Sequence, residues 1–270
     1  MDNGNKFAEE RKARITNNAM DGSLLKARDH FLLESIRTQY SYNFNWLSRP
    51  IIQYPQDIVA VQEIIWEVKP DLIIETGIAH GGSLILSASM LALLDCCDAI
   101  ESKSTFNPNA TKRRVLGLDI DIRKHNLDAI NAHPMSHRID MIQGSSIAPE
   151  IIHQVHEYSK NFSRILVMLD SNHTHEHVLA ELEAYAPLTS KGSYCVTFDT
   201  VVEDLPNDMF LDRPWGQGNN PKTAVREYLR LLKENGRKGV DGAPLHFEVD
   251  QNIENKLLLT VAPNGYLKRI

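Results

Sequence analysis

Two acidic residues each follow an apolar stretch of the chain, and together they can hold a metal ion. Asp170 comes directly after the apolar run 163–169, and Asp199 comes directly after the run 193–198. Because ligands of parallel sheets bind beyond the carboxyl ends of the strands, we expect both carboxylates to face one cleft. Such oxygen ligands suit a hard cation such as Mg²⁺. A bound cation can hold a substrate hydroxyl and lower its pKa, which makes the hydroxyl a better nucleophile.

Three histidines, His173, His175 and His177, follow the first of these acids. His173 lies three residues past Asp170, within reach of a metal-bound hydroxyl. An imidazole changes its charge near neutral pH, which suits a general base, so Asp170 and His173 are the candidate catalytic residues. Residues two apart on a helix point in different directions, so the three histidines cannot share one zinc ion, although His173 and His177 can share a helix face and leave a zinc site as an alternative. We interpret His175 and His177 as a solvated helix start.

A glycine-rich stretch follows an earlier apolar run, 71–75, and forms a candidate cofactor site. Glu75 and Gly77 come first, and the small residues 81–83 follow them. Small residues let a ligand approach the backbone closely, and the amides at a helix start can bind it. The spacing is not the G-x-G-x-x-G of a dinucleotide fold. The alternative interpretation is a glycine turn that serves only strand-to-helix packing.

Two further strand ends complete a site for an adenosyl group. Asp119 ends the run 114–119, where a carboxylate can accept hydrogen bonds from both ribose hydroxyls; Asp121 is the alternative, although it suits a helix cap better. Ser145 follows the run 139–143, where a hydroxyl or amide can bind an adenine. In this order, at successive strand ends, these residues indicate an adenosyl cofactor. We assign cofactor binding to Glu75, Gly77, His80, Gly81, Ser83, Asp119 and Ser145.

The alternation of strands and helices predicts the fold that positions these residues. Five apolar runs alternate with helical stretches, which is typical of βαβ units and a parallel sheet. We therefore expect an α/β fold with a Rossmann-like, doubly wound, mostly parallel sheet. The residues 245–249 and 256–262 resemble an antiparallel hairpin on the edge of this sheet.

Two other segments are candidates for the walls of a substrate pocket. Residues 1–50 form a helical and aromatic extension, with a helix expected over 24–38, ahead of a cofactor-binding domain at 51–270. Its aromatic segment 40–46 packs against the domain or lines a substrate pocket. The segment 204–222, which contains Trp215, is rich in turn formers and large residues, so it is either a substrate lid or an ordinary loop.

The composition of the chain argues against several classes of protein. A formal net charge of −6 over 270 residues argues against a nucleic-acid binder. No apolar run approaches the roughly 20 residues that span a bilayer, and the first residues lack the order of a signal peptide. The three cysteines, two of them adjacent, imply no disulfide framework. We therefore expect a cytoplasmic protein without nucleic-acid or membrane partners.

From about Tyr40 onward, the chain resembles the cephalosporin hydroxylase/rhamnosyl O-methyltransferase family. The resemblance is carried by residues 53–57, 75–83, 117–121, 170–175 and 255–266. It implies an S-adenosylmethionine-binding fold with a metal site. It also implies that Asp170 and Asp199 bind the metal, and that His173 stands where related enzymes place a catalytic base.

One departure from the family pattern concerns the third metal ligand. Some members carry glutamate immediately before the second metal aspartate, whereas this chain has Phe198, which cannot bind a metal. The resemblance therefore leaves Thr200 as the candidate third ligand, or leaves the site without one. Glu203 and Asp204 are nearby acids that can substitute.

The leading hypothesis from the sequence is methyl transfer from S-adenosylmethionine to a hydroxyl of a sugar or glycosylated metabolite, assisted by Mg²⁺ or another divalent cation. The expected partners are this small-molecule or saccharide acceptor and further copies of the chain in a homo-oligomer. One alternative is a metal-dependent oxygenase, whose iron would need two histidines and a carboxylate, here His173, His175 and Asp170. Another is a non-catalytic adenosyl-binding subunit. The sequence does not identify the acceptor.

Overall fold

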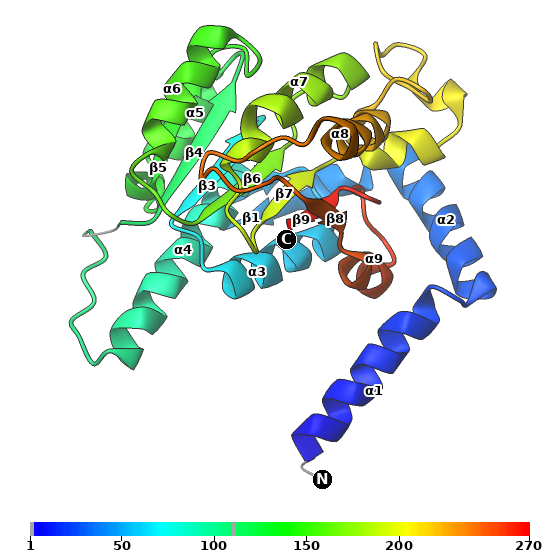
Figure 1. The fold of residues 1–270 in the computed structure, drawn as a ribbon, viewed down its shortest axis with the longest axis horizontal. Coiled ribbons are helices and arrows are strands. Elements are labelled where there is room, and N and C mark those ends of the chain that lie inside the picture. The colour runs from blue at the N-terminus through cyan, green and yellow to red at the C-terminus, as the bar shows by residue number, and fades with distance from the viewer. Residues whose placement is uncertain (1–2, 110–111) are drawn as a thin grey trace.

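A central β-sheet organises the protein, and the computed structural model describes residues 3–109 and 112–270 (Figure 1). The strands are β3 (Leu72–Thr76), β4 (Arg114–Asp119), β5 (Ile139–Gln143), β6 (Ile165–Leu169), β7 (Tyr194–Thr197), β8 (Phe247–Val249) and β9 (Tyr266–Arg269). Among the described residues they form one seven-stranded sheet in the order β5-β4-β3-β6-β7-β9-β8. β3 to β7 run parallel, and β9 pairs antiparallel with both β7 and β8. The predicted α/β class and mostly parallel sheet are confirmed.

Helices cover both faces of the sheet, which explains why its central strands β3, β6 and β7 are mostly apolar. One face packs against α3 (Pro55–Val68), α4 (Gly82–Glu101), α5 (Lys124–Asn131) and α9 (Gln251–Leu257); the other packs against α6 (Pro149–Ser159), α7 (His175–Tyr185) and α8 (Pro221–Asn235). Successive side chains of a strand alternate between these faces: Ile73 joins the first core and Ile74 joins the second. Parallel strands buried on both faces read as continuous apolar runs.

The N-terminal extension carries two helices and a small hairpin. α1 (Asn3–Asn18) extends away from the body of the molecule in Figure 1, and α2 (Gly22–Arg37) follows it. Asp21 caps α2 by accepting hydrogen bonds from the amides of Ser23 and Leu24, each at 3.0 Å. The hairpin pairs β1 (Phe44–Trp46) with β2 (Arg49–Ile51). The helix expected over 24–38 is confirmed, whereas α1 was not predicted.

The helix α4 is the one described helix that is long and apolar enough to cross a membrane, with a mean hydropathy of 1.7 over its most apolar stretch. The expectation that no run approaches this length was therefore wrong. More than half of that stretch, 56%, is buried inside the fold. Leu84, Leu91 and Leu94 belong to the core cluster that also contains residues of α3 and of the sheet. The apolar composition of α4 thus matches its place as a core helix.

The expected antiparallel C-terminal pair at the edge of the sheet is confirmed, but its second strand lies further along the chain than predicted. β8 lies within the predicted strand 245–249, but residues 256–262 form the end of α9 and a loop, and the second strand is β9. The apolar run at 256–262 resembles a strand because it is buried: the amide of Val261 donates to the Asp57 carboxylate of α3 at 3.0 Å. β9 lies between β7 and β8, so β8 alone of this pair lies at an edge of the sheet, and β5 forms the other edge.

Candidate active site

A cavity of about 670 Å³ lies beyond the carboxyl ends of β3, β6 and β7. Its walls come from the loops that follow these strands, from residues 36–54 of the N-terminal extension, and from residues 201–215. The strand order reverses at β3, which has β4 on one side and β6 on the other, and ligands of α/β sheets bind at such a point. The volume falls within the range of small-molecule sites.

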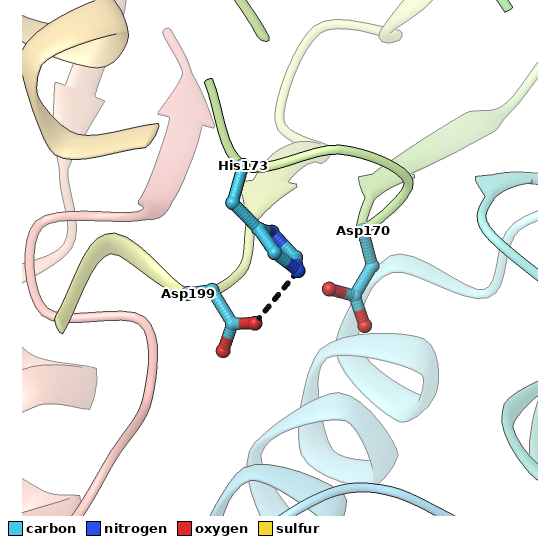
Figure 2. A group of neighbouring side chains, drawn as sticks. All are labelled: Asp170, His173 and Asp199. Atoms are coloured by element: carbon cyan, nitrogen blue, oxygen red, sulfur yellow. Dashed lines mark ion pairs between the residues drawn. The ribbon is translucent and has the colours of Figure 1, made fainter. Parts of the chain in front are cut away.

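Asp170, His173 and Asp199 converge in this cavity (Figure 2). One ligand atom from each residue lies within 4.8 Å of the others, and His173 Nε2 is 3.2 Å from Asp199 Oδ2. The amide of Asp170 donates to the carbonyl of Thr76 at 3.0 Å, which fixes the turn beyond β6 against β3. Asp199 has a left-handed backbone, with φ of 53°. Such strain in a non-glycine residue is typical of functional sites.

Negative charge is concentrated around Asp170. Burial raises the pKa of the Asp170 carboxyl well above its ordinary value, and the charges of Asp199, Glu75 and Glu181 raise that pKa further. A bound cation would relieve this repulsion. Two carboxylates and one imidazole are a donor set that a divalent metal accepts. The residues present therefore fit a metal site.

The residues predicted to complete the metal site lie elsewhere. Thr200 is fully buried, and its hydroxyl donates to the carbonyl of Pro263 at 2.7 Å. Glu203 accepts a hydrogen bond from the amide of Gly218 at 2.8 Å, and Asp204 pairs with Lys222. The structure corrects the assignment of Thr200, because the turn at Asp199 directs the next side chain toward the C-terminal loop. Among the described residues, the third member of the group that could hold a metal ion is His173.

The loop after β3 requires glycine at Gly77. Its φ is 88°, and a Cβ atom at this position would collide with the backbone of Asp170. The Gly77 amide donates to the carbonyl of Leu118 at 2.8 Å, so the loop leaves the sheet between β4 and β6. At Gly81 a Cβ atom would collide with the side chain of Ile130, which supports the packing interpretation for that glycine.

Asp119 holds the same loop in place. Its Oδ2 atom accepts hydrogen bonds from the amides of Ile78, at 2.8 Å, and Ala79, at 3.2 Å. Its Oδ1 atom accepts from the amide of Asp121 at 3.0 Å. The sequence indicated only a ribose contact for this carboxylate. Asp119 thus shapes the loop, and both of its oxygens retain capacity for a further donor.

Glu75 is buried beneath this loop with one oxygen unpaired. Ser83 donates its hydroxyl to Glu75 Oε1, whereas Oε2 has no hydrogen-bond partner among the described residues. Burial raises the pKa of Glu75 to about 8, and the bond from Ser83 opposes this rise. A buried carboxylate oxygen without a donor fits the ammonium group of an amino-acid ligand. This observation supports a cofactor with such a group.

Two residues that the sequence analysis missed fix the loop from outside. Arg49 donates from Nε to the carbonyl of His80 at 3.0 Å, and Asn126 donates to the carbonyl of Ala79 at 2.8 Å. Arg49 also donates to the side-chain oxygen of Asn126 at 3.2 Å. No local pattern identifies this pair, because it joins the N-terminal extension to α5 through the fold.

The imidazole of His177 belongs to a partly buried polar cluster, which corrects its interpretation as a solvated residue. Its Nε2 atom lies 3.0 Å from the hydroxyl of Ser146 and 3.2 Å from that of Ser171. Glu181, fully buried, accepts the Ser171 hydroxyl at 2.6 Å. The cluster joins the loop that contains Ser145, where adenine binding was predicted, to the turn that carries Asp170.

His175 is also partnered, and this bears on the oxygenase hypothesis. Its Nδ1 atom lies 2.8 Å from the hydroxyl of Thr223 in α8, and among the described residues the metal-compatible group contains His173 alone of the three histidines. The set of His173, His175 and Asp170 that an iron oxygenase would need is therefore not assembled. The group has two carboxylates and one histidine.

Aromatic residues from two segments border the cavity. Tyr40 packs among Phe31, Phe44 and Tyr54, with ring centroids 5.1–5.8 Å apart, so part of the aromatic segment belongs to the core. Tyr42 instead lines the cavity. Trp215, from the segment 204–222, meets the His173 ring edge-on at 4.8 Å between centroids. Both interpretations of the aromatic segment therefore apply, to different residues.

Known proteins resemble this chain in sequence and in fold. The family model described as rhamnosyl O-methyltransferase/CmcI matches residues 38–270. A rhamnosyl O-methyltransferase of Mycobacterium tuberculosis is 28% identical over 221 residues, which are 79% of this chain and 73% of that protein. The protein of the same name from Mycobacterium leprae is 28% identical over 225 residues, 83% of this chain and 82% of that protein.

Two solved structures of CmcI share the fold. One, described as containing Mg and SAM, has a TM-score of 0.52 and 16% identity, and covers 85% of this chain and 77% of that chain. The other, an apo-structure, has a TM-score of 0.51 with the same identity and coverage. The predicted methyltransferase fold is confirmed. The chain therefore belongs to the rhamnosyl O-methyltransferase/CmcI family of S-adenosylmethionine-dependent O-methyltransferases.

Proposed function

We propose that this protein transfers the methyl group of S-adenosylmethionine to a hydroxyl of a sugar or glycosylated metabolite, with a divalent cation at Asp170 and Asp199. The observation that carries the proposal is the convergence of these carboxylates with His173 in the cavity that the Gly77 loop borders. The names of the relatives support a sugar hydroxyl as the acceptor. The CmcI structure described with Mg and SAM supports the pair of cofactors.

The cofactor residues divide between the cavity and its border. Gly77, His80 and Ser83 line the cavity, and the unpaired oxygen of Glu75 lies beneath them, so this end would hold the amino-acid part of the cofactor. Asp119 and Ser145 lie outside the cavity wall at the ends of β4 and β5, where we place the adenosine part.

The residues of the chain prepare the acceptor hydroxyl for methyl transfer. A cation bound by Asp170 and Asp199 would hold that hydroxyl and lower its pKa. His173 accepts the proton through Nε2, the atom that faces Asp199. Trp215 packs edge-on against the imidazole and restricts its rotation. The sulfonium already activates the methyl group, so the protein contributes mainly alignment and removal of the proton.

Three further assignments belong to this proposal. The segment 204–222 acts as a lid over the acceptor, because Trp215 reaches from it to His173. The protein works in the cytoplasm, consistent with its free cysteines. It assembles into a homo-oligomer, which light scattering of the purified protein checks directly.

The central test is methyl transfer from S-adenosylmethionine to methyl rhamnoside, with MgCl₂ or with EDTA. We expect turnover with Mg²⁺ and none with EDTA. Asp170→Asn should lose turnover and the Mg²⁺-induced rise in melting temperature while it retains S-adenosylhomocysteine binding. Asp208→Asn, which lines the cavity outside the metal group, is the matched control and should behave as wild type. Undiminished turnover in EDTA would exclude the metal-assisted mechanism.

The same assay separates the two roles open to His173. If His173 is the base, His173→Gln lowers kcat by about 10²–10⁴-fold and leaves the Mg²⁺-induced rise in melting temperature unchanged. If His173 is a metal ligand, the variant loses both methyl transfer and the Mg²⁺-induced rise in melting temperature. Wild-type kcat in this variant would remove His173 from the mechanism.

A further inference from the structure

Two arginines lie on the cavity wall away from the glycine loop. Arg37 is the last residue of α2, and Arg213 lies in the segment 204–222; both line the cavity that holds the metal group. The protein as a whole is acidic, with a formal net charge of −6. The carboxylates in the cavity lining are Asp170, Asp199 and Asp208, so the two guanidinium groups supply its positive charge.

The Trp215 ring lies between Arg213 and the imidazole of His173 and contacts both. The guanidinium carbon of Arg213 lies 5.3 Å from the ring centroid of Trp215, and Trp215 meets the ring of His173 at 4.8 Å between centroids. The stacking restricts the plane of the guanidinium and leaves its N–H groups available. The side chain is exposed and, within residues 3–109 and 112–270, makes no ion pair or side-chain hydrogen bond.

Other arginines near the cavity already have partners. Arg226 pairs with Glu203 at 3.4 Å, and Arg49 is bound to backbone and side-chain oxygens. Arg37 forms only an exposed pair with Glu34 at 3.6 Å, and such surface pairs contribute little free energy. An incoming anion can therefore engage Arg37 at small cost and Arg213 without breaking any ion pair.

We propose that the acceptor carries an anionic group, a phosphate or a carboxylate, beside the sugar ring that is methylated, and that Arg213 binds this group with Arg37 as a second contact. The inference rests on the proposed function and narrows its substrate class. Arginine presents a planar set of donors that matches both anions. One aromatic ring separates Arg213 from His173, so the anion would lie about one sugar ring from the reacting hydroxyl.

The test compares three acceptors: rhamnose 1-phosphate, the methyl glycoside of glucuronic acid, and neutral methyl rhamnoside. For wild type with Mg²⁺, we expect KM at least about tenfold lower for an anionic acceptor than for the neutral one, which corresponds to about 1.4 kcal/mol. Arg213→Gln should raise the KM of the anionic acceptor about tenfold, with kcat little changed and the neutral acceptor unaffected. The phosphate and glucuronate arms identify which anion is bound.

Arg226→Gln is the matched control, since Arg226 is an exposed arginine that does not line the cavity. Unchanged melting temperatures in both variants confirm that they fold. Equal KM values for all three acceptors in wild type, or an Arg213→Gln effect of the same size on the neutral acceptor, would overturn the proposal. Calorimetry of each acceptor with the protein loaded with S-adenosylhomocysteine and Mg²⁺ reads anion binding independently of turnover. If calorimetry shows tighter binding of the anionic acceptors than of the neutral one, but no methyl transfer occurs, the proposed function is refuted and this inference is not.

Discussion

Glu75 is a buried acid, Asp170 is a half-buried one, and the charge of Glu75 disfavours the charged form of Asp170. Glu75 contributes to the raised pKa of Asp170, and no basic side chain is among the main influences on either carboxyl. Clustered carboxylates with raised pKa values are typical of sites that bind a cation or transfer protons. The apo protein therefore keeps these acids in an arrangement that its ligands would stabilise.

The buried Glu75 carboxyl predicts a pH-dependent stability of the apo protein. Its pKa is about 8 in the fold against an ordinary value of 4.5, so its contribution to stability is fully present below pH 4.5 and is lost as pH rises toward 8. Glu75→Gln removes this dependence. The melting temperature of wild type minus that of the variant should therefore fall between pH 5 and pH 8, measured without cofactor or metal.

Glu67→Gln, at an exposed glutamate, serves as the control and should show a constant difference over the same range. A constant difference for Glu75→Gln as well would mean that Glu75 does not titrate in this range.

The sequence predicts the position of a site residue well when that residue ends a strand. It predicts poorly which way a side chain points and therefore which partners it contacts. Asp170 and Asp199 were placed together because adjacent parallel strands end at one edge. The direction of Thr200 depends on the left-handed backbone of Asp199, which no residue pattern reveals. Two partners of His177, Ser146 and Ser171, come from the loops after β5 and β6, so its partial burial follows from the fold and not from its own helix alone.

At the scale of elements, the loop after β3 is held from three directions. β4 contributes Asp119, α5 contributes Asn126, and the N-terminal hairpin contributes Arg49. A loop fixed in this way presents its amides to a cofactor with little further loss of conformational entropy on binding. The glycines allow the backbone conformation of the loop, and the hydrogen bonds of these three side chains fix that conformation.

The variant Asp119→Asn tests whether the Asp119 carboxylate both holds the loop after β3 and contributes to cofactor binding. The amide weakens the bonds to Ile78 and Ala79, so we expect S-adenosylhomocysteine affinity to fall about tenfold or more and the melting temperature to fall by a few degrees. Asp121→Asn changes an exposed neighbour and should leave both unchanged. Calorimetry and thermal unfolding provide the measurements, and unchanged affinity in Asp119→Asn would remove this residue from the cofactor site.

The elements were largely predictable because burial on both faces gives parallel strands a continuous apolar pattern. The bounds of β4 and β5 agree with the predicted runs. The same pattern predicts a strand wrongly at 256–262, where an apolar loop is buried against α3, and the buried helix α4 is a longer apolar run than the sequence prediction allowed. An apolar run indicates that a segment is buried. It indicates a strand only when the lengths of the segments before and after it also suit a strand in the sheet.

At the scale of the whole molecule, the N-terminal extension contributes to the wall of the cavity. Residues from 36–54 and from 201–215 both line the cavity, and the hairpin is tied to α4 by a hydrogen bond from Trp46 to Ser89 at 3.0 Å. The boundary predicted at residue 50, between the N-terminal extension and the cofactor-binding domain, separates sequence regions of different composition. The cavity needs residues from both sides of that boundary.

Truncation distinguishes the two parts of the extension. Removal of residues 1–20 deletes α1 but keeps the Asp21 cap of α2, so we expect KM and kcat near those of wild type. Removal of residues 1–38 also deletes Ile36 and Arg37 from the cavity wall and should raise the acceptor KM while S-adenosylhomocysteine still binds. A loss of methyl transfer on removal of α1 alone would contradict this division. Light scattering of the shorter deletion reports whether α1 joins copies of the chain.

The position of β9 inside the sheet bears on how the protein is made on the ribosome. β8 leaves the ribosome before β9 but has no place in the sheet until β9 pairs with β7. Asp57 and Thr200 also await late partners, Tyr266 and Pro263. During synthesis the nascent chain therefore exposes one side of β7 as an unpaired edge, a site where strands of other chains can add. A chaperone that shields this edge would matter most during the last steps of translation.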